Sequence, residues 1–186
     1  MRPVERAEIV DWQTWTDLRE AQRPRVLEAK RVRRVPIGSF LTLLFENRDT
    51  VRYQVQEMMR VERIVRERDI QHELGTYNEL LGGDGELGTT LLIGIEDADA
   101  RDGLLRRWIG LQERVYVVLP GGERVRPTWD PRQVGTDRIS SVQYLRFATG
   151  GVAPIAVGCD FDDPQVCLEV SLNPEQIAAL AEDLAG

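Results

Sequence analysis

The sequence is poor in histidine, cysteine and lysine. His72 is the one histidine of the 186 residues, so a single chain cannot supply a site built on two or more histidines. Cys159 and Cys167 have a spacing of eight, which matches neither a metal knuckle nor a Cys-x-x-Cys redox motif. Lys30 is the one lysine among 24 basic residues. This usage is typical of an arginine-rich proteome, and selection for bidentate anion recognition is the alternative.

Long apolar runs and recognised catalytic motifs are also missing. No stretch approaches the roughly 18 apolar residues of a membrane helix, and the N-terminus does not resemble a signal peptide, so a cytoplasmic protein is expected. The glycines at 82–85 are not followed by Gly-Lys-Ser/Thr, no Rossmann fingerprint follows a strand, and no serine lies in a nucleophile elbow. Metal ligands could come only from carboxylates, and the Glu-x-x-His pairs that di-iron helix bundles use are missing. We therefore expect neither a metal nor a cofactor.

What is present predicts an α+β fold: a mostly antiparallel sheet with flanking helices, including a helix–helix unit at 47–82 and a C-terminal helix. A single domain over 1–186 is expected, with a helix-rich lobe at 1–84 and a strand-rich lobe at 85–186 as a possible division. Gly150-Gly151 is expected to join two strands as a hairpin. Strand patterns cover residues 35–45, 87–95, 114–119, 123–129, 139–147, 152–161 and 165–172.

The stretch Phe40–Leu81 is the densest mixture of apolar and polar side chains. Asn47 is a good N-cap for a helix that continues to Arg66. Glu62 falls in the middle of its apolar stripe, where a carboxylate must be paired or have its pKa raised. Glu62 therefore either bonds an arginine at the edge of the core or belongs to a polar site with Gln54, Glu46 or the next helix. The stripe consists of Val51, Val55, Met58 and Val65.

A second helix follows a short joint. Asp69 is expected to cap it, and Tyr77 would bring its hydroxyl towards the core, with Glu62 as a candidate acceptor. His72 lies opposite the apolar stripe and is expected on the surface rather than in a catalytic site. The stripe consists of Ile70, Leu74, Tyr77 and Leu81.

The N-terminal part combines an arm with a basic helix. The first dozen residues are expected to form a loose arm, followed by a helix over 16–32 in which Pro24 begins a second segment or makes a kink. Between Arg19 and Arg34 the net charge is +5, although the whole chain has −7. This basic face could contact phosphate or an acidic partner, or it could simply be solvated. Its members at helical spacing are Arg19, Arg23, Lys30 and Arg34.

The two cysteines flank a predicted turn at 162–164 and could be cross-strand neighbours. In a reducing compartment they would be two buried thiols, and a redox switch is the alternative.

The segment LTLLFENRDTVRYQVQEMMRVERI, with Tyr77-Asn78-Glu79-Leu80-Leu81, resembles a bacterial family, domain-of-unknown-function family 3501. The pieces Ser141–Phe147 and the closing Leu-x-Pro-Glu segment resemble it too, so the similarity covers nearly the whole chain. The family has no established activity. Its members tend to be encoded beside rubrerythrin-like proteins and iron–sulfur, flavin-linked oxidoreductases, which implies a redox or oxidative-stress context. The motif residues are Glu46, Asn47, Gln54, Gln56, Glu57, Arg60, Glu62, Tyr77 and Asn78.

Three functional hypotheses remain open. The first is an accessory protein that docks a redox enzyme, or a second copy of itself, or that binds a small anionic ligand. The second is an enzyme for a small anionic substrate, with Glu62 as acid or base, Tyr77 as donor and Arg60 as clamp. The third is nucleic-acid binding through the basic face, which the net charge of −7 disfavours. The ligand-binding candidates are Glu46, Asn47, Gln54, Glu57 and Asn78.

Overall fold

The computed structural model of the chain describes residues 1–131 and 135–186. It confirms the α+β class, with a C-terminal helix and antiparallel strand pairing throughout the described sheets. The strands form two four-stranded sheets. Sheet A has the order β1-β2-β3-β6, and sheet B has the order β5-β4-β7-β8.

The element bounds follow the chain in order. The helices are α1 (Trp12–Arg31), α2 (Arg48–Glu62), α3 (Glu67–Asn78), α4 (Ala98–Arg107) and α5 (Pro174–Ala185), with short 3-10 helices at Arg6–Glu8 and Leu111–Arg114. The strands are β1 (Arg34–Ile37), β2 (Leu41–Phe45), β3 (Glu86–Ile93), β4 (Val115–Val118), β5 (Arg124–Val125), β6 (Val142–Ala148), β7 (Ala156–Cys159) and β8 (Leu168–Ser171).

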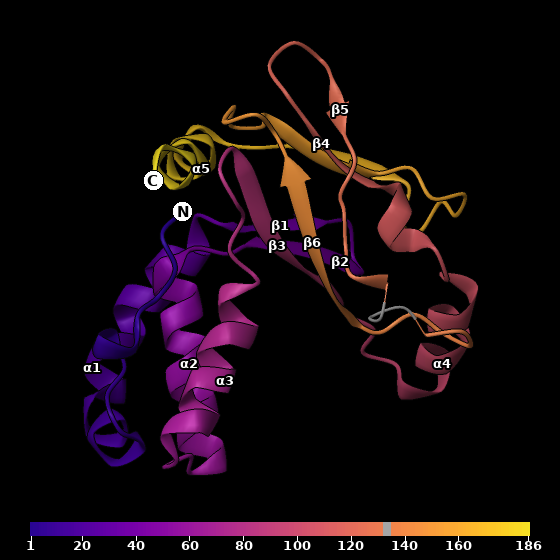
Figure 1. Cartoon of the computed structure of the whole chain (residues 1–186). Coiled ribbons are helices and arrows are strands. Elements are labelled where there is room, and N and C mark those ends of the chain that lie inside the picture. The colour runs from indigo at the N-terminus through magenta and orange to yellow at the C-terminus, as the bar shows by residue number, and fades with distance from the viewer. Residues whose placement is uncertain (132–134) are drawn as a thin grey trace.

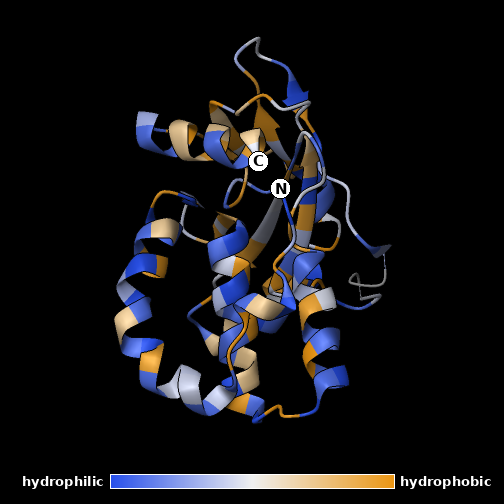
Figure 2. Cartoon of the chain, turned by 60° about the vertical axis from the view of Figure 1, so that its left-hand side comes forward, coloured by the Kyte–Doolittle hydropathy of each residue, from blue (hydrophilic) through white to orange (hydrophobic). Residues whose placement is uncertain are grey.

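The two larger of three hydrophobic clusters among the described residues hold the molecule together. The larger one lies between the sheets, where inward residues of sheet A such as Leu43 and Phe147 meet Val117 and Val157 of sheet B. The smaller one joins α2, α3 and the N-terminal arm. Figure 1 shows α1, α2 and α3 side by side on one side of the molecule and α4 on the other. In Figure 2 the strands are largely orange, whereas the helices are mostly blue with interspersed orange residues.

Sheet A contains strands from both halves of the chain. β2 comes before residue 84 and β3 comes after it, and the two strands pair with each other. The helix-rich and strand-rich halves of the sequence therefore share one sheet. The single strand expected over 35–45 is instead a hairpin of β1 and β2. Gly38 makes the turn, since its φ of 65° lies in the left-handed region that suits glycine.

The strands on either side of Gly150-Gly151 do not pair with each other, so the expected hairpin is wrong. β6 pairs with β3 in sheet A, whereas β7 pairs with β4 and β8 in sheet B. Both glycines have a positive φ, of 63° and 81°, and the Gly151 N–H donates to the Gly85 carbonyl at 3.2 Å. The turn therefore directs the chain from one sheet to the other.

The helix–helix unit lies where it was predicted, but α2 ends and α3 begins at other residues than expected. Asn47 caps α2, as its side chain accepts from the Thr50 N–H at 3.0 Å. The helix ends at Glu62 because Arg63 takes a left-handed φ of 52°. α3 begins at Glu67, so Asp69 lies in the first turn and is not its cap.

The N-terminal part is more ordered than its sequence suggests. α1 starts at Trp12, capped by Asp11, and continues through Pro24 as one helix. The arm before it is held by two amide side chains. Gln56 pairs with the N–H and C=O of Val10 at 2.8 and 3.0 Å, and Asn78 does the same for Val4 at 2.8 and 2.9 Å. Because a primary amide can accept from the backbone N–H and donate to the backbone C=O of one residue, the arm is fixed rather than loose.

The C-terminal helix α5 is anchored through a buried ion pair. Asn173 caps it, with Pro174 in the first turn. Near its end, Asp183 accepts from Arg33 Nε at 2.6 Å and Nη2 at 2.9 Å. Both side chains are less than a tenth exposed, at 9% and 8%. No helix in the described part of the chain combines the length and apolarity that a membrane crossing requires.

Candidate functional site

The groove between the outer face of sheet A and the helices α2 and α3 is the candidate site. The outer face is the one that points away from sheet B. One compartment of the groove has a cavity volume of about 310 Å³, in the range of small-molecule sites. Its polar lining is Lys30, Arg34, Glu46, Thr50, Gln54, Tyr77, Thr90 and Tyr144.

The floor of the groove is set by strand register. Arg34 faces Leu44, Leu44 faces Thr90, and Thr90 faces Tyr144. Residues directly opposite in antiparallel strands point to the same face. This row therefore crosses the sheet from β1 to β6, with a cation at one end and a phenol at the other.

Two glycines bring the end of α3 down onto the sheet. A Cβ on Gly88 would lie 1.8 Å from the Leu80 carbonyl oxygen, and one on Gly82 would lie 2.3 Å from the Glu86 carbonyl oxygen. The lack of a side chain at these positions is what permits the close approach. It places Tyr77 and Leu80, from the last turns of this segment, above the groove.

Glu46 is the buried carboxylate of the groove. It is 7% exposed, and each of its oxygens accepts a short hydroxyl bond, from Thr50 at 2.5 Å and from Thr90 at 2.6 Å. It forms no ion pair with any residue that the structure describes. A buried carboxylate needs such hydrogen bonds, and the remaining lone pairs of Glu46 can serve a ligand.

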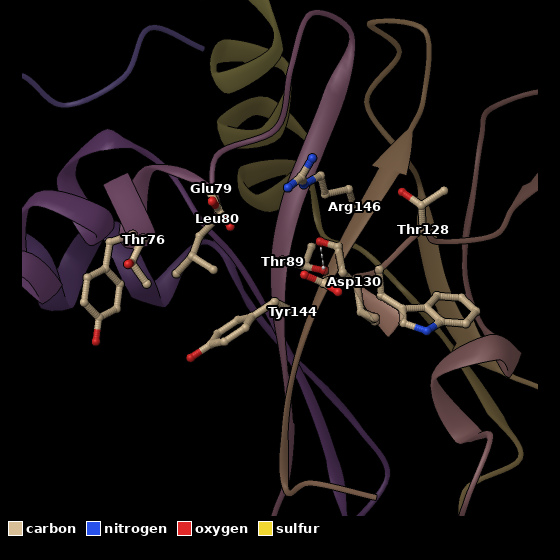
Figure 3. Close-up of a pocket in the computed structure, with 11 residues that line it drawn as sticks. Thr76, Glu79, Leu80, Thr89, Thr128, Asp130, Tyr144 and Arg146 are labelled. Carbon is tan, nitrogen blue, oxygen red and sulfur yellow. Dashed lines mark hydrogen bonds between the residues drawn. The ribbon is translucent and has the colours of Figure 1, made fainter. Parts of the chain in front are cut away.

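Tyr144 closes the row beside Glu46. Burial raises the pKa of Tyr144, and the nearby Tyr77 and Glu46 raise it further. The phenol therefore keeps its proton at neutral pH and can donate a hydrogen bond. In Figure 3, Tyr144 extends from β6 towards the side of the groove where Thr76 and Leu80 of the α3 segment lie.

Of the four cations of the predicted basic face, Arg19, Arg23 and Lys30 lie on α1, and Arg34 does not. Arg34 belongs to β1 rather than to the helix, and Arg19 binds Glu57 at 3.0 Å. Other cations of the 19–34 stretch also find carboxylates within the chain: Arg25 pairs with Asp49, Arg31 with Glu28 and Glu175, and Arg33 with Asp183. Lys30 and Arg34 have no ion pair with a described residue, and both line the groove.

Glu57 and Arg60 serve the packing of α1 on α2. Glu57 accepts from the Trp15 indole at 2.8 Å, from Arg19 and from Arg60. Burial alone would raise the pKa of Glu57, but the Trp15, Arg60 and Arg19 hydrogen bonds together lower it below its ordinary value. Among the other proposed ligand residues, Asn47 and Asn78 hold the helix cap and the N-terminal arm.

The burial expected for Glu62 is wrong. Glu62 is exposed, and Val65 is 74% exposed, because the helix ends before its stripe could continue onto the core. Met59, rather than Met58, is the buried methionine of α2. Tyr77 lies in the last turn of α3, whereas Glu62 is the last residue of α2, just before the joint that leads into the first turn of α3, so they are not partners. His72 is exposed, as predicted.

Sequence reasoning thus named Glu46, Gln54, Tyr77, Lys30 and Arg34, which the fold brings to one cavity. It missed Thr50 in the first turn of α2 and residues from strands and a loop further along the chain. The alternating pattern of β6, which exposes every second residue, was the available signal for two of them. The missed residues are Thr50, Thr90, Trp129, Tyr144 and Arg146.

The two cysteines are not bonded to each other. Cys159 is buried and Cys167 is exposed, and both are free thiols. Within residues 1–131 and 135–186, no three His, Cys, Asp or Glu side chains gather as a metal site would require.

Comparisons with known proteins agree with this fold. A family model described as "Protein of unknown function (DUF3501)" matches residues 3–184. A crystal structure of a novel protein of unknown function from Burkholderia pseudomallei K96243 is similar, with a TM-score of 0.88 and 30% sequence identity over 98% of this chain and 100% of that chain. No curated protein matches the sequence.

Proposed function

We propose that this chain, which belongs to the DUF3501 family, is a binding protein for a small anionic ligand. The observation that carries the proposal is the position of Lys30 and Arg34, which have no ion pair among the described residues and open onto the same cavity as Glu46. The Lys30 ammonium lies 5.8 Å from the centre of the Tyr53 ring, but neither cation has a carboxylate partner among the described residues. Such cations beside a buried polar floor favour an acid over a neutral molecule. Glu46, Gln54 and Tyr77 would orient the rest of the ligand through hydrogen bonds.

Calorimetric titration with inorganic phosphate and with ribose 5-phosphate tests this proposal. The Lys30→Met variant should bind ribose 5-phosphate about tenfold more weakly, because a charge-assisted hydrogen bond contributes roughly 1.5–3 kcal/mol. Arg23→Met is the matched control, since Arg23 is an exposed α1 cation outside the groove. Native mass spectrometry on protein from its own host should show a co-purifying acid. Equal affinity in both variants would refute the assignment.

An accessory role beside a redox enzyme is the second element of the proposal. It is supported by the resemblance of the motif to a family encoded beside oxidoreductases, and not by a feature of the groove. Co-purification of such an oxidoreductase with the chain at micromolar concentration is the expected result. If the chain elutes alone from a mixture with the candidate enzyme, this role is excluded while ligand binding stands.

An enzyme is the other candidate function, and Glu46 is the observation that favours it. With Glu62 exposed, Glu46 is the buried carboxylate that could act as a base, next to a phenol that stays protonated. Incubation of the wild type with the co-purified acid, followed by mass spectrometry, should then show conversion. Glu46→Gln should abolish conversion and keep binding. An unconverted ligand would exclude the enzyme.

A further inference from the structure

The groove has a second compartment at its β6 end. Its cavity volume is about 430 Å³, and it lies between the end of α3, strand β6 and the loop at 128–130 (Figure 3). The two compartments share Tyr77, Leu80 and Tyr144 as lining residues. One ligand can therefore extend from the cations at the β1 end into the space beyond Tyr144.

The length of such a ligand follows from the sheet. Arg34 and Tyr144 lie in one cross-strand row, three strand spacings apart. At roughly 4.8 Å per spacing this is about 14 Å between their Cα atoms. A small inorganic anion would fill only the β1 end. A molecule with an acidic group and a second part several bonds away would fill both compartments.

The second compartment is lined by aromatic side chains. The loop carrying Trp129 is fixed to β6, because Thr128 and Arg146 exchange two backbone hydrogen bonds at 2.8 and 2.9 Å. Trp129 is half-buried, packs against the larger core and lines the cavity. Tyr144 is 39% exposed and also lines it. Two ordered aromatic side chains beside an open cavity favour a flat ring, since aromatic rings stack or meet edge to face.

The polar groups of this compartment are suited to a ring with nitrogen at its edge. The Glu79 carboxylate can accept an N–H donor, and the Arg146 guanidinium can donate to ring nitrogen or oxygen. In Figure 3, Asp130 and Arg146 lie on either side of Thr89 at the sheet. A purely aliphatic ligand would make no hydrogen bond with Glu79 or Arg146.

We propose that the ligand is a nitrogen heteroaromatic ring joined to an anionic group, the class that includes the mononucleotides. The anion lies with Lys30 and Arg34, and the ring lies between Tyr144 and Trp129. This inference rests on the proposed anion-binding function and adds the ring. The same ring would explain why a tryptophan is held half-open on a loop whose backbone is fixed.

Calorimetry with a matched set of probes tests the ring. The probes are AMP, GMP, CMP and UMP, with ribose 5-phosphate as the ring-free reference. At least one mononucleotide should bind about tenfold more tightly than ribose 5-phosphate, in line with base stacking on an aromatic side chain. Trp129→Leu should remove that tenfold gain and leave ribose 5-phosphate affinity unchanged. Trp12→Leu, at a tryptophan outside the groove, should leave both affinities unchanged.

The outcomes separate the two proposals. If no mononucleotide binds more tightly than ribose 5-phosphate, or if Trp129→Leu weakens both probes equally, the ring assignment is overturned. Ribose 5-phosphate binding that still depends on Lys30 would then leave the anion site in place. If no probe binds at millimolar concentration, both proposals fail.

Discussion

The buried pair between Arg33 and Asp183 should dominate the attachment of α5. The Asp183→Ala variant leaves the Arg33 guanidinium buried with the Ala29 carbonyl, 3.0 Å away, as its one remaining protein acceptor among the described residues. Removing one partner of a buried ion pair typically costs about 3–5 kcal/mol, because the other charge stays desolvated. That is a large share of the roughly 5–15 kcal/mol of stability of a typical domain.

Urea unfolding followed by tryptophan fluorescence measures the effect through the midpoint and slope of the transition. Glu175→Ala is the control, because Glu175 also joins α5 to α1 through Arg31, but with side chains 65% and 55% exposed. An exposed pair of this kind contributes less than about 1 kcal/mol. The double variant Arg33→Met/Asp183→Leu should recover most of the loss. Equal costs for the two alanine variants, or no recovery, would refute the reasoning.

Three further outcomes are expected. Gly88→Ala should lower the free energy of unfolding in urea by about 2 kcal/mol or more and weaken anion binding, because the new Cβ would lie 1.8 Å from the Leu80 carbonyl oxygen. Gly103→Ala should do neither, because nothing lies within 4 Å of its Cβ position. The Trp108 indole donates a hydrogen bond to Asp163 and lowers the pKa of that carboxyl below 3.8. The stability from this interaction is present above pH 3.8 and is lost as the pH falls through the pKa of the folded state. The Trp108→Phe variant should therefore be less stable than the wild type near pH 7, but its free energy of unfolding should fall less on acidification to about pH 3. Burial raises the pKa of Cys159 to about 11, so a thiol reagent should rapidly label Cys167 alone until urea exposes the second thiol.

Local features of the fold could be predicted from the sequence. The caps at Asn47 and Asn173 follow from neighbouring residues alone, because a cap is satisfied by backbone groups two or three positions away. The corner after Glu62 could not, since a non-glycine residue in the left-handed region is not signalled by the stripe that precedes it.

The groove itself depends on contacts that no local pattern contains. Arg34 and Tyr144 face one cavity because two intervening strands place them in one row. Glu46 could be named from the motif, but its partner Thr90 comes from the next strand of the sheet. The sequence therefore indicated half of the site and left the other half to strand order, which the mistaken hairpin at Gly150-Gly151 concealed.

The amide clamps on the N-terminal arm also bear on the order in which the chain can fold during synthesis. Val4 leaves the ribosome before the Asn78 side chain that holds it, which is 74 residues further along. The hydrogen bond from the Val10 N–H likewise cannot form until Gln56, 46 residues further along, has been made. The arm therefore takes its final position only after the helices that hold it have been made. Until α3 has emerged, Val4 and Ile9 remain apolar groups in water, available to chaperones that bind nascent chains.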